Sequence, residues 1–131
     1  MRRLRILVVD DTPEFLEAAT TLLSAHPRAE VVGTARSAAQ AIQLIGTLAP
    51  DLVIMDVVMP GMDGVAATKR IAGMPSPPEV VVVTFYNSVE LQREAMAAGA
   101  VAFVSKERLV EEVFPIIDAR VSGAFDPLAG V

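Results

Sequence analysis

Several residue types are scarce or missing in this 131-residue chain, which has no cysteine, no tryptophan, one tyrosine and one histidine. The absence of cysteine excludes disulfide bonds and thiolate metal sites. The lone histidine, His26, has no second imidazole with which to share a metal, so we expect it to be a surface residue near a helix end. No apolar run approaches the ~20 residues that span a bilayer. The run at residues 6–9 is too short for a signal sequence, so we expect a cytoplasmic protein without a membrane segment.

Positive charge is also scarce, because 11 Lys and Arg face 16 Asp and Glu and leave a net charge of −5. This balance gives no electrostatic reason to expect direct nucleic-acid binding. Apolar residues make up 53% of the chain and aromatic residues only 5%, which indicates an aliphatic core and argues against disorder. The length suits one domain, which we expect to comprise residues 1–122, followed by a tail at 123–131.

Short apolar runs alternate with helical patterns along the chain. The expected strands comprise residues 5–10, 29–35, 52–56, 80–84 and 101–104. The expected helices lie between residues 12 and 26, 37 and 50, 64 and 74, 87 and 99, and 107 and 121. Pro115 lies inside the last of these, so we expect a kink there or a later helix start. Strand–helix alternation predicts an α/β fold with a parallel sheet and helices on both faces.

Polar side chains follow four of the predicted strands, namely Asp10 with Asp11, then Asp56, Thr84 and Lys106. The carboxyl ends of parallel strands meet at one edge of the sheet, so these side chains should converge. Two carboxylates ~4 Å apart repel by about 4 kcal/mol at an effective dielectric of about 20. Lys106 would offset part of this repulsion, and a divalent cation more. An all-oxygen site of this kind suits Mg²⁺, and an aspartate beside it could act as a nucleophile toward phosphorus.

These motifs resemble, in order and spacing, those of the receiver domain of two-component response regulators. The matching segments are Val8-Val9-Asp10-Asp11, Met55-Asp56, Met59-Pro60-Gly61-Met62-Asp63-Gly64, Val83-Thr84 and Val104-Ser105-Lys106. The resemblance implies a flavodoxin-like, doubly wound five-stranded parallel sheet of order 2-1-3-4-5 with five helices on its two faces. Details at residues 31–35 and 62–68 are most similar to receivers that carry a helix-turn-helix output domain.

The resemblance also implies roles for individual residues. Asp56 would accept a phosphoryl group from a sensor histidine kinase. Lys106 would pair with Asp56 and then with a phosphoryl oxygen, while Thr84 would move its hydroxyl onto the phosphoryl group. Phe103 occupies the position of the rotating aromatic residue that reports this movement. The residue after the switch hydroxyl is usually small in the family, whereas Phe85 stands here.

The implied cofactor is Mg²⁺. By the resemblance, Asp11, Asp56 and the backbone carbonyl of Val58 would ligate it directly, and Asp10 would hold it mostly through water. Asp11 has an alternative interpretation as the N-cap of the first helix, and Asp63 is expected to cap the helix that begins at Gly64. Considered alone, Thr84 is more often an ordinary strand residue than a switch, and Phe103 is at least as often a core residue as a rotating reporter.

The expected function is therefore a phosphorylation-activated signalling switch and not an enzyme. The alternative is the N-terminal receiver fragment of a DNA-binding transcriptional regulator. A phosphoaspartate phosphatase is a second alternative, but such enzymes usually have a carboxylate two residues after the nucleophile, where Val58 stands. A flavin-binding module is a third, but Asp10, Asp11 and Glu14 would repel a flavin phosphate. The expected partners are a sensor histidine kinase, an output domain or protein of unknown identity, and a second copy of the chain.

Overall fold

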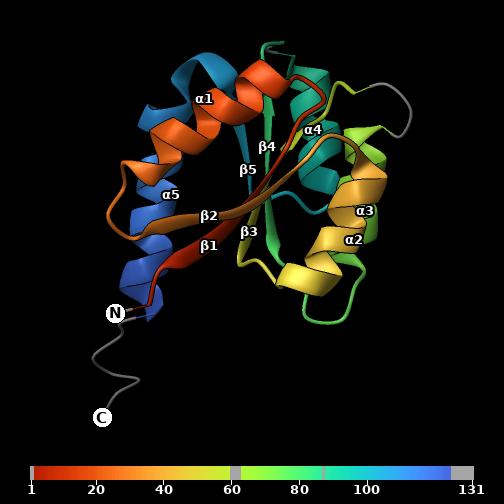
Figure 1. The fold of residues 1–131 in the computed structure, drawn as a ribbon. Coiled ribbons are helices and arrows are strands. Elements are labelled where there is room, and N and C mark those ends of the chain that lie inside the picture. The colour runs from red at the N-terminus through yellow and green to blue at the C-terminus, as the bar shows by residue number, and fades with distance from the viewer. Residues whose placement is uncertain (1, 60–62, 87, 125–131) are drawn as a thin grey trace.

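A five-stranded parallel sheet forms the centre of the protein in the computed structural model, which describes residues 2–59, 63–86 and 88–124 (Figure 1). The strands are β1 (Leu4–Val9), β2 (Ala29–Ala35), β3 (Leu52–Asp56), β4 (Glu79–Thr84) and β5 (Ala102–Ser105). Their order across the sheet is β2-β1-β3-β4-β5, and every neighbouring pair is parallel. The predicted doubly wound topology is confirmed.

Helices cover both faces of this sheet. They are α1 (Pro13–Ser24), α2 (Ala38–Leu48), α3 (Gly64–Ala72), α4 (Val89–Ala97) and α5 (Leu109–Ala124), with a short 3-10 turn at Lys106–Arg108. Helices α1 and α5 lie on one face, whereas α2, α3 and α4 lie on the other (Figure 1). None of the helices in the described ranges is long and apolar enough to cross a membrane.

The central strand β3 is buried on both faces, and its alternating side chains divide between two apolar cores. Val53 and Met55 face the core formed with α2, α3 and α4. Leu52 and Ile54 face the core formed with α1 and α5. All four side chains are inaccessible to solvent, and each contributes roughly 1.5–3 kcal/mol of burial free energy. Because both faces are buried, β3 fixes the position of Asp56 at its carboxyl end.

The helix starts near the sheet edge are fixed by local hydrogen bonds. Helix α1 begins after Thr12, whose backbone N–H donates to Oδ1 of Asp10 at 2.8 Å. The N-cap position is therefore Thr12, and the alternative that Asp11 caps this helix is wrong. Asp63 caps α3 as predicted, since its Oδ1 accepts from the N–H of Val65 at 2.7 Å.

The last helix begins slightly later than residue 107, because the 3-10 turn precedes Leu109. Pro115 nevertheless lies inside α5. Pro115 is exposed while Val113 and Ile117 are buried, so the backbone carbonyl that proline leaves without a donor lies toward the wet side of the helix. The domain boundary expected after residue 122 falls within α5, and residues 125–131 of the expected tail lie outside the described residues.

His26 is buried and not a surface residue, so that expectation is wrong. Only 6% of it is exposed, and its Nε2 lies 2.7 Å from Oδ1 of Asp118 on α5. Its Nδ1 accepts from the backbone N–H of Arg28 at 3.0 Å. The edge of the ring packs against Phe114, with the ring centroids 4.9 Å apart. His26 therefore ties the turn after α1 to the last helix.

Candidate functional site

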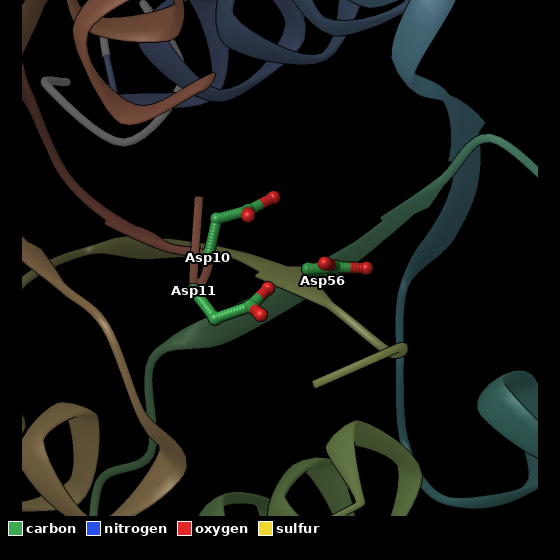
Figure 2. A group of neighbouring side chains, drawn as sticks. All are labelled: Asp10, Asp11 and Asp56. Carbon is green, nitrogen blue, oxygen red and sulfur yellow. The ribbon is translucent and has the colours of Figure 1, made fainter. Parts of the chain in front are cut away.

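Three carboxylates meet where β1 and β3 end, side by side at the centre of the sheet. Val9 of β1 is level with Met55 of β3, so Asp10 and Asp56 follow at neighbouring positions. Figure 2 shows the side chains of Asp10, Asp11 and Asp56 gathered at this edge. Each offers an oxygen, and the three oxygens lie within 4.8 Å of one another. Asp10 is fully buried, Asp56 is 3% exposed, and Asp11 is half-buried.

Among the described residues, Lys106 brings the one positive charge that forms an ion pair with the carboxylate groups of this cluster. It follows β5, two strands away from β3, and its Nζ lies 2.5 Å from Oδ2 of Asp10 and 3.1 Å from Oδ2 of Asp56. The ammonium thus bridges two carboxylates, where the sequence predicted a pair with Asp56. Its side chain is only 6% exposed, so water screens these ion pairs weakly.

Burial raises the pKa of the Asp56 carboxyl above its ordinary value, because the charged form loses its water. The backbone N–H of Val58 donates to Oδ1 of Asp56 at 3.0 Å, and this bond and Lys106 lower the pKa. The negative charge of Asp10 raises the pKa again. The site therefore holds an ionised Asp56 only against a desolvation penalty, and a further cation would relieve it.

The start of α3 lies directly against the end of β3. A Cβ placed on Gly64 would lie 2.5 Å from the backbone oxygen of Asp56 and 2.5 Å from Cα of Val57. The N–H of Gly64 also donates to the carbonyl of Val57 at 3.3 Å. Glycine at position 64 therefore allows the backbone to close the loop beneath Asp56. Residues 60–62, part of the matching segment at residues 59–64, lie outside the described residues.

Thr84 and Phe103 lie on the β4 and β5 side of the same edge. Thr84 is 2% exposed, and its Oγ1 accepts from the backbone N–H of Tyr86 at 3.0 Å. Phe103 is half-buried and lines a surface cavity of about 620 Å³ together with Thr84, Phe85 and Glu112. This placement is compatible with the roles predicted for them, which stay predictions.

Two aromatic rings complete the surroundings of Lys106. The Nζ atom lies 4.5 Å from the ring centroid of Phe15 on α1 and 5.0 Å from that of Phe85, which follows β4. Phe15 was not predicted to be part of the site, and Phe85 was noted only as a departure from the family pattern. The one available signal was an aromatic residue directly after a strand that ends in a polar side chain.

The donor set fits a hard divalent cation such as Mg²⁺. All candidate ligand atoms are carboxylate oxygens, the three carboxylates carry more negative charge than Lys106 neutralises, and Asp11 is open to solvent on part of its surface. Mg²⁺ is usually bound by one or two carboxylates and retains several waters. Asp11 and Asp56 meet that requirement. The contribution predicted for the carbonyl of Val58 stays a prediction, although its residue is held at the site by the hydrogen bond to Asp56.

Comparison with known proteins agrees with this geometry. Residues 6–118 match the family model described as "Response regulator receiver domain". The chain is 42% identical over 106 residues to protein-glutamate methylesterase/protein-glutamine glutaminase 3 of Anaeromyxobacter dehalogenans, a match that covers 80% of the chain and 31% of that protein. It is 32% identical to the transcriptional regulatory protein LiaR of Bacillus subtilis, covering 92% of the chain and 57% of LiaR.

A solved structure gives the same result for the fold. The response regulator domain of Thermotoga maritima CheB superimposes with a TM-score of 0.81 at 27% identity, covering 90% of this chain and 96% of that one. The two sequence relatives are longer than this chain, which spans about a third of the methylesterase and little more than half of LiaR.

Proposed function

Because this chain belongs to the family of response regulator receiver domains, we propose that it is a switch in which Asp56 accepts a phosphoryl group from a sensor histidine kinase. One observation carries the assignment of the residue. Asp56 is a buried carboxylate at the end of the central strand, bound by Lys106 and flanked by two further acids. Asp10 is also buried, also bound by Lys106 and part of the same acidic cluster, so the choice of Asp56 depends on its place at the end of the central strand and on the match of Met55-Asp56 to the receiver motif.

The proposed reaction is a displacement at phosphorus. A carboxylate oxygen of Asp56 attacks the phosphorus, the bond between phosphorus and the donor atom breaks, and the donor leaves with that electron pair. Mg²⁺, when bound, would neutralise charge on the phosphoryl oxygens. Lys106 is placed to contact a phosphoryl oxygen, because its Nζ is already 3.1 Å from Oδ2 of Asp56. The N–H of Val58 holds the other oxygen of Asp56 and so fixes the orientation of the carboxylate.

Phosphorylation would then change the conformation of residues on the side of the sheet that carries β4 and β5. The phosphoryl group adds negative charge and hydrogen-bond acceptors to the end of β3. Thr84 is placed on the adjacent strand, and we propose that its hydroxyl leaves the N–H of Tyr86 for the phosphoryl group. Phe103 would respond by a change of rotamer in the cavity beside it. Such a rearrangement favours one of two states of the surface formed by α4, β5 and α5.

The output of the switch is proposed at a coarser level. The methylesterase relatives and LiaR both extend well beyond the matched region, so we propose that an output domain or protein acts together with this receiver. A DNA-binding output is the alternative that the LiaR match favours. The esterase and glutaminase activities are those of the relatives, and we propose that this chain itself is a phosphoacceptor rather than an enzyme, located in the cytoplasm with its kinase. Pairing with a second copy belongs to the same proposal.

Intact-mass measurement after incubation with a small phosphodonor and Mg²⁺ tests the assignment. We expect the wild-type protein to gain the mass of one phosphoryl group and Asp56→Asn to gain none. Asp51→Asn is the matched control, because Asp51 lies at the opposite edge of the sheet, where it accepts from the N–H of Arg5. Equal labelling of wild type and Asp56→Asn would overturn the assignment.

A further inference from the structure

The ammonium group of Lys106 lies close to two aromatic rings from separate parts of the chain. Phe15 comes from α1, and its ring centroid is 4.5 Å from Nζ. Phe85 comes from the segment between β4 and α4, and its ring centroid is 5.0 Å from Nζ. Lys106 follows β5 at the carboxyl edge of the sheet, yet its side chain is only 6% exposed, because the rings and the carboxylates lie around it.

Phe85 is an unusual residue to leave at this position, since 58% of it is exposed. Burial of apolar area alone does not account for its placement, because more than half of the residue's surface remains exposed. The contact with Lys106 gives the ring a specific role, since an aromatic face attracts a cation within about 6 Å of its centroid. Phe15 differs in this respect, because it is half-buried and also packs against the core beneath α1.

The two rings restrict where the ammonium can go. Two of its N–H groups point to Asp10 and Asp56, at 2.5 and 3.1 Å. The two rings, with centroids within 5.0 Å of Nζ, replace water that would otherwise solvate the charge and would let the flexible four-carbon side chain swing outward. A lysine that is ordered before the phosphoryl group arrives loses less conformational freedom when it binds that group.

We propose that Phe15 and Phe85 are positioning residues, which form an aromatic slot that holds the Lys106 ammonium ready for the phosphoryl group on Asp56. This inference rests on the proposed function and adds to it. Phe85 directly follows Thr84, so the slot also connects the two residues that are expected to contact the phosphoryl group. Loosening the slot therefore weakens binding of a phosphoryl group through Lys106, without any contact between the rings and that group.

Equilibrium binding of beryllofluoride, a mimic of a phosphoryl group on a carboxylate, tests the inference in the presence of Mg²⁺. An equilibrium measurement separates positioning from access, because a bulky ring over the entrance would change rates and not affinity. We expect Phe85→Leu to weaken binding about three- to ten-fold, the range of a partly exposed cation–π contact. Phe85→Tyr retains the ring and should bind as wild type does, whereas leucine retains only the apolar bulk.

A double-mutant cycle with Lys106→Met identifies the route of the effect. If Phe85 acts through Lys106, then Phe85→Leu should change affinity by less than two-fold in the Lys106→Met background. If that background binds too weakly to measure, the contrast between leucine and tyrosine decides. NMR gives an independent readout, because the ring faces should shift the Lys106 ε-proton resonances upfield in wild type and in Phe85→Tyr, and less in Phe85→Leu.

The outcomes separate this inference from the proposed function. Beryllofluoride binding that is absent in wild type, or unchanged in Asp56→Asn, would overturn the function. Normal wild-type binding with equal affinities for wild type and Phe85→Leu would overturn the aromatic slot alone. Tighter binding by Phe85→Leu, or the same loss with tyrosine as with leucine, would also overturn it.

Discussion

Replacing Asp56 with asparagine should stabilise the protein in the absence of divalent cations. Asp56 is 3% exposed, and one of its oxygens lies within 4.8 Å of one oxygen of Asp10 and one of Asp11. At an effective dielectric of about 20, each of these two repulsions costs about 3 kcal/mol, and the attraction to Lys106 at 3.1 Å returns about 5 kcal/mol. The balance is slightly unfavourable before the desolvation of a buried carboxylate is added. Asparagine removes both costs, so we expect a gain of about 1–3 kcal/mol in the free energy of unfolding.

The gain should depend on pH with a definite sign. Burial raises the folded-state pKa of Asp56, so the folded protein binds this proton more tightly than the unfolded chain does. The contribution of Asp56 to wild-type stability therefore falls as the pH rises from the ordinary aspartate pKa of about 3.9 through the raised value. Asparagine does not titrate. The advantage of Asp56→Asn should be small at the acid end of this window and reach its full size above the raised pKa.

Urea unfolding followed by circular dichroism measures the effect, with EDTA in one series and Mg²⁺ in the other. With m between about 1 and 3 kcal/mol per M, the expected gain moves the midpoint upward by about 1 M in EDTA. Mg²⁺ should stabilise wild type more than the variant, because the variant lacks one candidate ligand. Asp51→Asn is the control with the opposite sign, since Asp51 is paired with Arg2 and with the N–H of Arg5. If Asp56→Asn is less stable than wild type in EDTA, the electrostatic reasoning is wrong.

Two further substitutions test the architecture around the site by the same unfolding measurement. His26→Leu should cost about 1–3 kcal/mol, because it leaves the partly buried N–H of Arg28 without its acceptor and removes the bond to Asp118; an unchanged midpoint would show that this link is dispensable. Gly64→Ala should cost at least about 1–3 kcal/mol, because the new Cβ would lie 2.5 Å from backbone atoms. Gly46→Ala is its control, since a Cβ there meets nothing within 4 Å and should stabilise α2 by about 0.5–1 kcal/mol; similar effects at both glycines would contradict the close approach.

Most of the fold could be predicted because its determinants are local. The apolar runs of the strands, the cap at Ser37 and the glycine after α4 can each be recognised within a few residues of sequence. Ser37 does accept from the N–H of Gln40, and Gly99 has φ of +116°, which favours glycine. Parallel alternation then leaves few arrangements. The strand order itself came from the resemblance, not from these local signals.

The candidate site, like the fold, was predicted where its determinants are local in the sequence and missed where they are not. Asp10, Asp11, Asp56 and Lys106 were predicted to converge because each follows a strand, and strand ends share an edge of the sheet. The aromatic slot was missed because it depends on which side of α1 is turned toward Lys106 and on the path of the chain after β4. No periodicity in sequence encodes how a ring on a helix approaches a lysine that lies far along the chain.

His26 was wrongly predicted to lie at the surface, and a comparison with Asp56 explains why. A lone histidine after a helix agrees with local rules for a surface turn, and its burial depends on Asp118 and Phe114, contributed by the last helix. Asp56 conflicts with local rules, because it places a carboxylate at the end of an apolar strand that is buried on both faces of the sheet. A residue that is unfavourable in its local surroundings points to function, because function can maintain a residue that lowers the stability of the fold. The stabilisation expected for Asp56→Asn measures that cost, so the feature that made Asp56 recognisable in the sequence is the one that the unfolding experiment should detect.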